Sequence, residues 1–214
     1  MVSKVFVWGR TGSGKSTTVR MLTEEVQQFG WSVETFNDYP FLREMFLADD
    51  GKRFRPTEYN GFEVLDPLVF EEAFRRLKQK IQHFQHLSSK TLITIEFTSN
   101  NYLQALKVFG GEFLQESNYL FMLADLATCL SRVNNRTIHP ECPDDYYVLD
   151  AVLLHHYPCP YMPPTIDSID NERITKIPNM GSMDELRGYI RQLVPSLLKK
   201  IELTPPKQVL ALVE

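Results

Sequence analysis

The pattern G-x-x-x-x-G-K-[ST] is matched at every fixed position by the stretch Gly9-Arg10-Thr11-Gly12-Ser13-Gly14-Lys15-Ser16. Residues 4–8 before it, apolar apart from Lys4, predict a buried strand, and residues 17–29 after it have the apolar spacing of a helix. Glycines let such a loop curl so that several backbone N–H groups point into one concavity, where the following helix places the positive end of its dipole. The order strand, glycine loop, helix therefore predicts a site for a nucleoside triphosphate.

The side chains of this loop have separate expected tasks. Lys15 is expected to neutralise oxygens of the β- and γ-phosphates, and the Ser16 hydroxyl is expected to hold Mg²⁺. The other loop residues and Thr17 are expected to contact the phosphates. The sequence contains neither the Asn-Lys-x-Asp pattern that recognises guanine nor an Asp-x-x-Gly after the loop. We therefore predict ATP and Mg²⁺ as the cofactors.

Composition narrows the class of protein. The chain has 214 residues, of which 43% are hydrophobic and 23% charged, as expected for one globular domain with its own core. A net charge of −4 argues against general binding to nucleic-acid backbones. No apolar run approaches the roughly 20 residues of a membrane span, and the first strand leaves no room for a signal peptide. We expect a cytoplasmic protein that does not bind membranes.

Two His-x-x-Cys pairs, His139 with Cys142 and His156 with Cys159, raise the alternative of a zinc site. Residues 144–156 have helical spacing, and a helix of that length separates its ends by about 20 Å. Zinc ligands all lie about 2 Å from the ion. We therefore prefer to interpret these residues as ordinary lid and loop residues.

Strands and helices are predicted to alternate along the chain. Strands are expected at residues 4–8, 31–36, 91–96, 119–124 and 173–177. Helices are expected at residues 17–29, 41–47, 66–84, 101–109, 126–135, 144–157 and 182–200. This alternation predicts an α/β fold, with a parallel sheet of about five strands between two layers of helices and right-handed crossovers.

Three helices carry further local signals. The first is expected to bury Val19, Leu22, Val26 and Phe29. The third is expected to bury a stripe of Phe70, Phe74, Leu77, Ile81 and Phe84. Ser182 followed by Glu185 predicts a capping box at the start of the last helix.

A second informative stretch is Ala124-Asp125-Leu126-Ala127-Thr128-Cys129-Leu130-Ser131-Arg132-Val133-Asn134-Asn135-Arg136, where a predicted strand ends and a helix begins. Arg132 and Arg136 are four residues apart and so project from one face of that helix. Together with the glycine loop, this layout resembles the nucleoside and nucleoside monophosphate kinases, a group of P-loop phosphotransferases. In that group such arginines close over the phosphates, where a planar guanidinium grips phosphate through two hydrogen bonds. The alternative is a solvated basic helix face.

The resemblance covers most of the chain and implies a domain organisation. Residues 1–200 are expected to form a single P-loop NTPase domain. Within it, a helical lid is expected at about 126–157 and an acceptor-side insertion at about 38–66. Residues 201–214 are left as a C-terminal tail.

Two carboxylates are expected at the carboxyl ends of strands, where ligands of parallel sheets gather. Asp38 resembles the acceptor-side carboxylate of small-molecule kinases, which orients the acceptor hydroxyl or takes its proton; the alternative is a turn residue before Pro40. Glu96 resembles a Walker B residue that holds Mg²⁺ directly or through water. The group more often has Asp there, so a role as base, an acceptor contact and a structural role stay open for Glu96.

Weaker expectations concern the insertion and the last loop. Arg43, Arg53 and Arg55 would suit an acceptor that carries a phosphate or carboxylate, but a solvated charged loop is the preferred interpretation. The resemblance places the loop at residues 179–181 beside the adenine, with contacts from its backbone.

The resemblance implies an ATP-dependent kinase whose acceptor is a small molecule, with a nucleoside or nucleotide-like compound as first candidate. One alternative is a regulatory ATPase or switch that acts through a protein partner, and another is a nucleotide-binding protein without turnover. The paired arginines Arg132 and Arg136 favour the kinase, because a switch needs none in its own chain. The sequence leaves open the acceptor and the oligomeric state, a homodimer included.

Overall fold

The structure of the chain is a computed structural model that describes residues 1–58, 61–84, 90–97, 102–115, 117–138 and 171–203. The lid beyond residue 138 lies outside the described residues, and so do the candidate zinc residues. The same holds for residues 204–214 of the predicted tail. No helix of the described part is long and apolar enough to cross a membrane.

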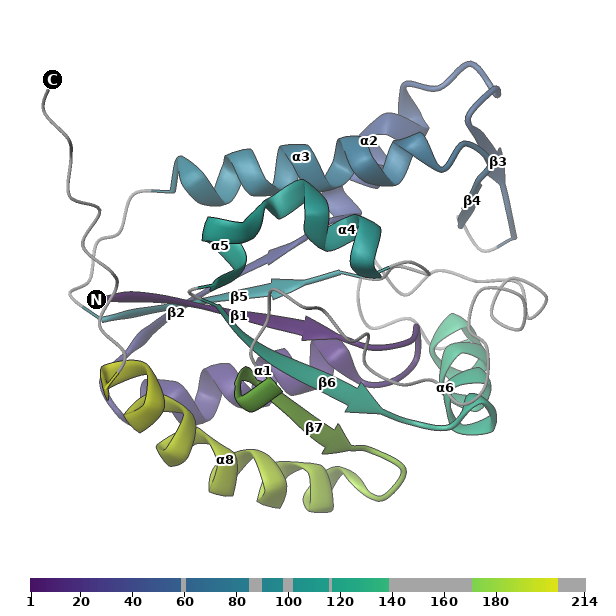
Figure 1. Cartoon of the computed structure of the whole chain (residues 1–214). Helices are drawn as coiled ribbons and strands as arrows, with labels where there is room; N and C mark the ends of the chain where they lie inside the picture. Colours follow the sequence, from purple (N-terminus) through teal and green to yellow (C-terminus); the bar gives the residue numbers. More distant parts are fainter. Residues whose placement is uncertain (59–60, 85–89, 98–101, 116, 139–170, 204–214) are drawn as a thin grey trace, which may run out of the picture.

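A five-stranded parallel sheet forms the centre of the molecule (Figure 1). Its order is β2-β5-β1-β6-β7. The strands are β1 (Val2–Trp8), β2 (Ser32–Asn37), β5 (Thr91–Glu96), β6 (Ser117–Leu123) and β7 (Ile174–Pro178). The inner strands β1, β5 and β6 are largely buried, as expected for parallel strands covered on both faces. The predicted α/β fold with a three-layer architecture is thus confirmed.

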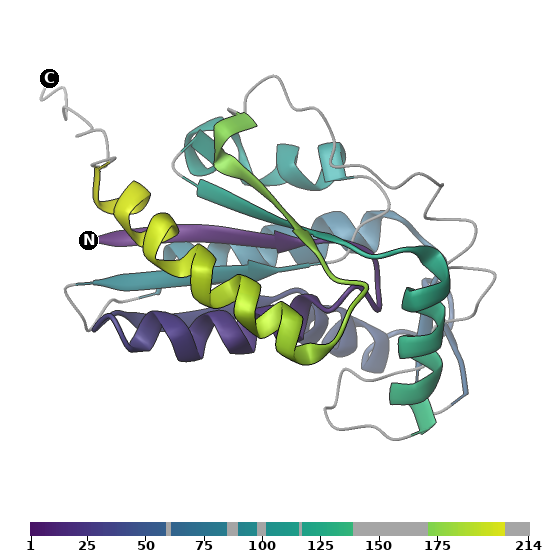
Figure 2. The ribbon, with the colours of Figure 1, turned by 90° about the horizontal axis from the view of Figure 1, so that it is seen from below.

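Helices cover both faces of the sheet (Figures 1 and 2). One face is covered by α1 (Lys15–Gln27) and α8 (Met183–Leu203). The other is covered by α3 (Leu68–Gln82), α4 (Tyr102–Phe109) and α5 (Gly111–Gln115). Side chains of β1 alternate between these faces: Val5 and Val7 enter the aliphatic core under α1 and α8, whereas Phe6 and Trp8 enter an aromatic core on the other side.

The strand order places a candidate site at the carboxyl end of β1. From β1 the chain first builds β2 and β5 on one side of β1, and then β6 and β7 on the other. In parallel α/β sheets, ligands bind in the crevice outside the carboxyl ends of strands where the order reverses in this way. The glycine loop leaves β1 at this edge, and α6 (Leu126–Ile138) lies at the same edge in Figures 1 and 2.

The predicted acceptor-side insertion is more ordered than the sequence indicated. It contains α2 (Tyr39–Leu47), which was predicted at residues 41–47. It also contains an antiparallel hairpin of β3 (Phe54–Pro56) and β4 (Phe62–Val64), and this hairpin was not predicted. Strands of three residues are too short to show an alternating pattern. The hairpin packs its aromatic side chains against α2 and α3, where Phe46 stacks on Phe62 with ring centroids 4.9 Å apart.

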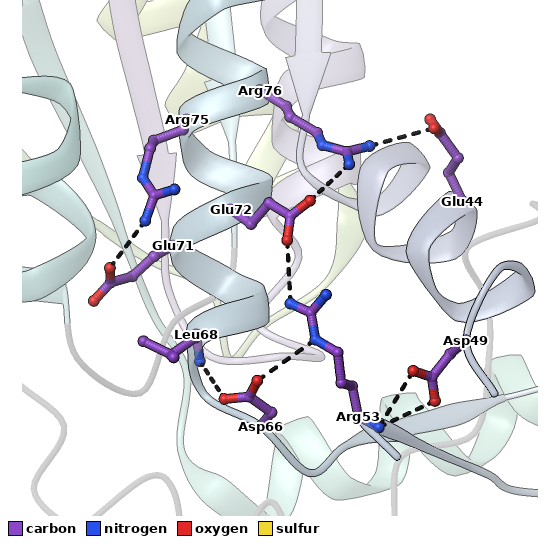
Figure 3. A network of polar contacts seen from close by, with 9 residues as sticks. All are labelled: Glu44, Asp49, Arg53, Asp66, Leu68, Glu71, Glu72, Arg75 and Arg76. Atoms are coloured by element: carbon purple, nitrogen blue, oxygen red, sulfur yellow. Dashed lines mark hydrogen bonds and ion pairs between the residues drawn. The ribbon is translucent and has the colours of Figure 1, made fainter. Parts of the chain in front are cut away.

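A network of ion pairs also ties this insertion to α3 (Figure 3). Arg53 contacts Glu72 at 3.1 Å and Asp66 at 3.5 Å. Arg76 contacts the other oxygen of Glu72 at 2.6 Å and reaches Glu44 on α2 at 3.3 Å. The Glu72 carboxylate is therefore shared by two guanidinium groups from different parts of the chain.

We expect Glu72→Gln to lower the free energy of unfolding at pH 7 by about 1 kcal/mol, a modest amount because the partly exposed pairs are screened. The hydrogen bond from Arg53 holds the pKa of Glu72 below its usual 4.5, with Arg76 adding to the effect and burial opposing it. Because the pKa is lower in the folded state, this stabilisation is present above pH 4.5 and is lost as the pH falls through the folded-state pKa. Urea unfolding at pH 7 and pH 3 measures both effects. Glu58→Gln is the control, because Glu58 is exposed and forms no ion pair with the residues that the structure describes; an equal loss in both variants would contradict the prediction.

The element bounds differ from the predicted ones by up to three residues, and one buried position was wrong. Phe29 is 51% exposed, because α1 ends at Gln27 and the chain turns at Gly30, which has a φ of 75°. Of the predicted α3 stripe, Phe74, Leu77 and Ile81 are buried, and Phe70 and Phe84 are partly buried. The predicted capping box is confirmed: the Glu185 N–H donates to Ser182 Oγ at 3.2 Å, and the Ser182 N–H donates to Glu185 Oε2 at 2.7 Å.

Candidate active site

The glycine loop is held between α6 and the segment that follows β7. Gly12 and Gly14 have φ values of 80° and 92°, a region that L side chains rarely adopt. A Cβ at Gly12 would lie 2.5 Å from the carbonyl oxygen of Cys129 on α6. A Cβ at Gly14 would lie 2.2 Å from Nδ2 of Asn179. Both positions therefore need glycine for close approach as well as for backbone conformation.

Lys15 lies folded over the loop from which it comes. Its side chain is buried, with the residue 6% exposed, and Nζ donates to the carbonyl oxygens of Gly9 at 3.1 Å and Arg10 at 3.0 Å. Burial lowers the pKa of Lys15, since the ammonium loses hydration there. The loop thus holds a cation on its own carbonyl groups at the place where the sequence predicts phosphates.

Three predicted site residues lie within electrostatic reach of this ammonium. Besides burial, the pKa of Lys15 responds to the carboxylates of Glu96 and Asp38, which raise it, and to Arg136, which lowers it. These residues come from β5, the end of β2 and α6. The fold therefore brings together groups that are far apart in the sequence, at the carboxyl ends of the strands.

Ser16 and Glu96 form a direct contact. The Ser16 hydroxyl donates to Glu96 Oε1 at 2.7 Å, and the neighbouring strands β1 and β5 place Glu96 opposite Val7, just before the loop. A hydroxyl and a carboxylate are oxygen ligands of the kind that Mg²⁺ prefers, and Mg²⁺ usually binds through one or two protein groups, substrate phosphates and waters. The two side chains thus fit a Mg²⁺ site beside the loop.

Asp38 is buried, with the residue 7% exposed, and it directly precedes α2. Its backbone carbonyl accepts hydrogen bonds from the N–H groups of Phe41 and Leu42, both at 3.1 Å, whereas its side chain makes no capping bond to α2. The preceding Asn37 pairs with Glu96 in the sheet register. Asp38 is thus a buried residue in electrostatic reach of Lys15, and its role toward an acceptor stays a prediction.

The two predicted lid arginines, Arg132 and Arg136, interact with different parts of the site. Asp125 begins α6 by accepting a hydrogen bond from the Thr128 N–H at 2.7 Å, which lowers the pKa of Asp125. One turn further on, Arg132 Nη1 donates to the carbonyl oxygen of Asn179 at 3.0 Å. The positive charge of Arg136 lowers the pKa of Lys15. Both arginines are half-buried, which argues against a fully solvated basic face.

The arginines of the insertion have structural partners. Arg53 belongs to the network with Glu72 and Asp66, and Arg55 pairs with Glu63 across the hairpin. Arg43 donates to the hydroxyl of Tyr39 at 3.2 Å. These contacts support the preferred interpretation, in which the three arginines belong to a charged surface.

The side chain of Asn179 contacts the glycine loop, and the sequence analysis did not predict this contact. Its Nδ2 donates to the carbonyl oxygen of Ser13 at 2.8 Å, and its backbone N–H donates to the Leu123 carbonyl at 2.8 Å. The sequence predicted only backbone contacts from this loop to an adenine. The one available signal was a polar residue directly after a strand, at the edge of the sheet where ligands gather.

Comparison with known proteins gives the class of fold. No protein-family model matches the chain, and no curated protein matches it significantly. Among solved structures, a gluconokinase from Sinorhizobium meliloti 1021 is similar, with a TM-score of 0.51 and 11% identity over 94% of this chain and 96% of that chain. A shikimate kinase from Acinetobacter baumannii, in complex with shikimate, has a TM-score of 0.52 and 13% identity over 94% and 95% of the two chains. The APS kinase of Mycobacterium tuberculosis, in complex with AMPPNP and APS, has a TM-score of 0.53 and 16% identity over 94% and 97%.

The chain therefore has the fold of the P-loop small-molecule kinases, and the resemblance inferred from the glycine loop and α6 is confirmed at the level of fold. Each neighbour spans nearly the whole of both chains, so the likeness includes the helical layers as well as the loop. The acceptors named in these structures differ from one another, which agrees with the general rule that a fold does not specify a substrate.

Proposed function

We propose that this protein is a Mg²⁺- and ATP-dependent phosphotransferase that transfers the γ-phosphoryl group to a small molecule, with a nucleoside or nucleotide-like compound as first candidate. The observation that carries the proposal is an intact phosphate loop in which the Ser16 hydroxyl donates to Glu96 at 2.7 Å, and whose buried Lys15 lies in electrostatic reach of Glu96, Asp38 and Arg136. Phosphoryl transfer requires positioned charges more than covalent chemistry from the protein, and this arrangement supplies both signs of charge.

Each group has a proposed role. The loop N–H groups and Lys15 bind the triphosphate, and Lys15 exchanges the carbonyls of Gly9 and Arg10 for phosphate oxygens when the nucleotide enters. Ser16 and Glu96 would hold Mg²⁺, which when bound would neutralise charge on the phosphates. Asp38 orients the acceptor hydroxyl and takes its proton.

Arg132 and Arg136 act on the phosphoryl group from α6. Charge on that group is spread over its equatorial oxygens in the transition state, and a guanidinium stabilises it there. Arg136 already lowers the pKa of Lys15 through its charge, whereas Arg132 reaches the phosphates by leaving the carbonyl of Asn179. The two arginines are thus proposed to act at different stages of lid closure.

The first expected result is a thermal shift with a non-hydrolysable ATP analogue and Mg²⁺. A ligand at 100 times its dissociation constant stabilises the folded state by about 2.7 kcal/mol, which corresponds to a rise of roughly 5–10 °C in Tm for a chain of this size. A panel of nucleosides, nucleotides and phosphorylatable metabolites, each added with the analogue, then reveals the acceptor by a further rise.

Labelled ATP incubated with the compounds that respond must give a labelled product. If the analogue binds but no compound is phosphorylated, the result contradicts the proposed transferase activity. ATP hydrolysis that rises only when a protein partner is added would instead support a regulatory ATPase. A chain that does not respond to the analogue at all has no functional nucleotide site, and the proposal then fails at its first step.

A further inference from the structure

The side chain of Asn179 makes a contact with the phosphate loop that the proposed roles do not use. Its Nδ2 lies 2.8 Å from the carbonyl oxygen of Ser13. This carbonyl belongs to the same peptide group as the N–H of Gly14. Because a trans peptide is planar, its C=O and N–H point in opposite directions. A donor that fixes the Ser13 carbonyl therefore also fixes the direction of the Gly14 N–H, which points away from Asn179.

Asn179 is held in place by burial and by a backbone hydrogen bond. Asn179 is 6% exposed, and its backbone N–H is bound to the Leu123 carbonyl at 2.8 Å, so β6 holds the residue in place. The amide also lies so close to Gly14 that a Cβ there would be 2.2 Å from Nδ2. Position 14 therefore has to be glycine, because any larger residue would collide with the amide of Asn179.

Two other carbonyls of the loop are held differently. Those of Gly9 and Arg10 accept hydrogen bonds from Lys15 Nζ, and the proposed function moves this ammonium onto the phosphates. The Ser13 carbonyl is held by a residue 166 positions away, outside the loop. Its donor does not need to move when the nucleotide binds, so it can keep the Ser13–Gly14 peptide oriented before and after binding.

We propose that Asn179 is a positioning residue whose side-chain amide orients the Ser13–Gly14 peptide, so that the Gly14 N–H faces the phosphates of the bound nucleotide. This inference rests on the proposed function in so far as it requires a triphosphate in the loop. Since the backbone carbonyl of the same residue receives Arg132 at 3.0 Å, Asn179 connects the loop with the lid helix α6.

Two substitutions separate positioning from packing. Asn179→Ala removes the amide, and Asn179→Leu removes it while keeping a side chain of similar size; neither changes the charge or deletes the backbone carbonyl that accepts from Arg132. Asn118→Ala is the matched control, because Asn118 is also a buried asparagine but lies near the beginning of β6, opposite Val5. Thermal unfolding first establishes that all variants are folded.

The binding probes are a non-hydrolysable ATP analogue and inorganic tripolyphosphate, each with Mg²⁺ and measured by calorimetry. We expect both Asn179 variants to bind both probes roughly five- to tenfold more weakly than the wild type, as expected for one lost hydrogen bond. We expect Asn118→Ala to bind them as the wild type does. The Gly14 amide resonance in ¹H–¹⁵N spectra of the free protein should move in both Asn179 variants and keep its place in the control.

Several outcomes overturn the inference. Binding by Asn179→Leu at wild-type strength would mean that the residue only fills space. A loss seen with the ATP analogue but not with tripolyphosphate would place Asn179 at the base instead of the phosphates. Wild-type binding in both Asn179 variants would overturn this inference and leave the proposed function intact. A wild-type chain that binds neither probe would overturn both.

Discussion

Replacing Lys15 by methionine is expected to slow phosphoryl transfer by about 10²–10³-fold, the loss found when one preorganised group that stabilises transition-state charge is removed. Methionine keeps most of the length of the side chain and removes its charge. The ammonium is buried and in electrostatic reach of Glu96 and Asp38, in a setting where a charge acts more strongly than in water. The rate is measured as transfer from labelled ATP to the acceptor that the panel identifies.

The same substitution is expected to leave the chain folded. Burial lowers the pKa of Lys15 from its usual 10.5, so the ammonium costs stability at all pH values below the folded-state pKa. This cost is relieved as the pH rises from the folded-state pKa toward 10.5. Methionine removes the cost, and it also removes the hydrogen bonds to the carbonyls of Gly9 and Arg10, so the two effects oppose each other.

Lys199→Met, at an exposed position of α8, is the matched control and should keep both rate and Tm. The free energy of unfolding of the wild type, relative to that of Lys15→Met, should rise between neutral pH and pH 10, since only the wild type has this buried amine to deprotonate. Transfer by Lys15→Met within tenfold of the wild type would contradict the role of Lys15 at the phosphates.

Local patterns allowed much of the fold to be predicted. The glycine loop, the apolar run of β5 and the capping box of Ser182 and Glu185 are encoded within a few residues, and each was found where it was expected. The predicted apolar face of α1 wrongly included Phe29, because the spacing of apolar residues alone does not show where a helix ends. The hairpin of β3 and β4 escaped prediction because its stability comes from aromatic packing with α2 and α3 and not from its own periodicity.

Contacts between distant segments were harder to foresee. Ser16 and Glu96 were each predicted near Mg²⁺, but their hydrogen bond depends on β5 being the neighbour of β1. The bond between Asn179 and Ser13 depends on β7 lying beyond β6 at the same edge. Neither strand order can be derived from the pattern of one sequence, and so the side-chain role of Asn179 was not predictable.

The two carboxylates of the site should differ in what they do. Glu96 accepts a hydrogen bond from Ser16, the predicted Mg²⁺ ligand. Asp38 is buried at the end of the neighbouring strand, at the start of the insertion. We therefore propose that Glu96 acts on the metal and Asp38 on the acceptor. Isosteric amides test this division, because Glu96→Gln and Asp38→Asn remove a charge without changing shape.

We expect Asp38→Asn to lower kcat by about 10²–10⁴-fold, the usual contribution of a general base, with an unchanged Mg²⁺ concentration at half-maximal rate. We expect Glu96→Gln to raise that Mg²⁺ concentration at least about tenfold, since loss of a carboxylate in or next to the coordination sphere weakens metal binding, and to regain part of its rate at high Mg²⁺. Asp184→Asn, at an exposed residue of α8, is the control for both.

Titrating Mg²⁺ at saturating ATP and acceptor gives both quantities for each variant. If Glu96→Gln lost rate at every Mg²⁺ concentration while its metal requirement stayed at the wild-type value, Glu96 would be the base and Asp38 the residue to reassign. If both amides raised the metal requirement, the two carboxylates would share one ion between β2 and β5. A separation of the two effects would instead place the acceptor hydroxyl next to Asp38, and it would direct the search for the acceptor to the surface formed by α2 and the β3–β4 hairpin.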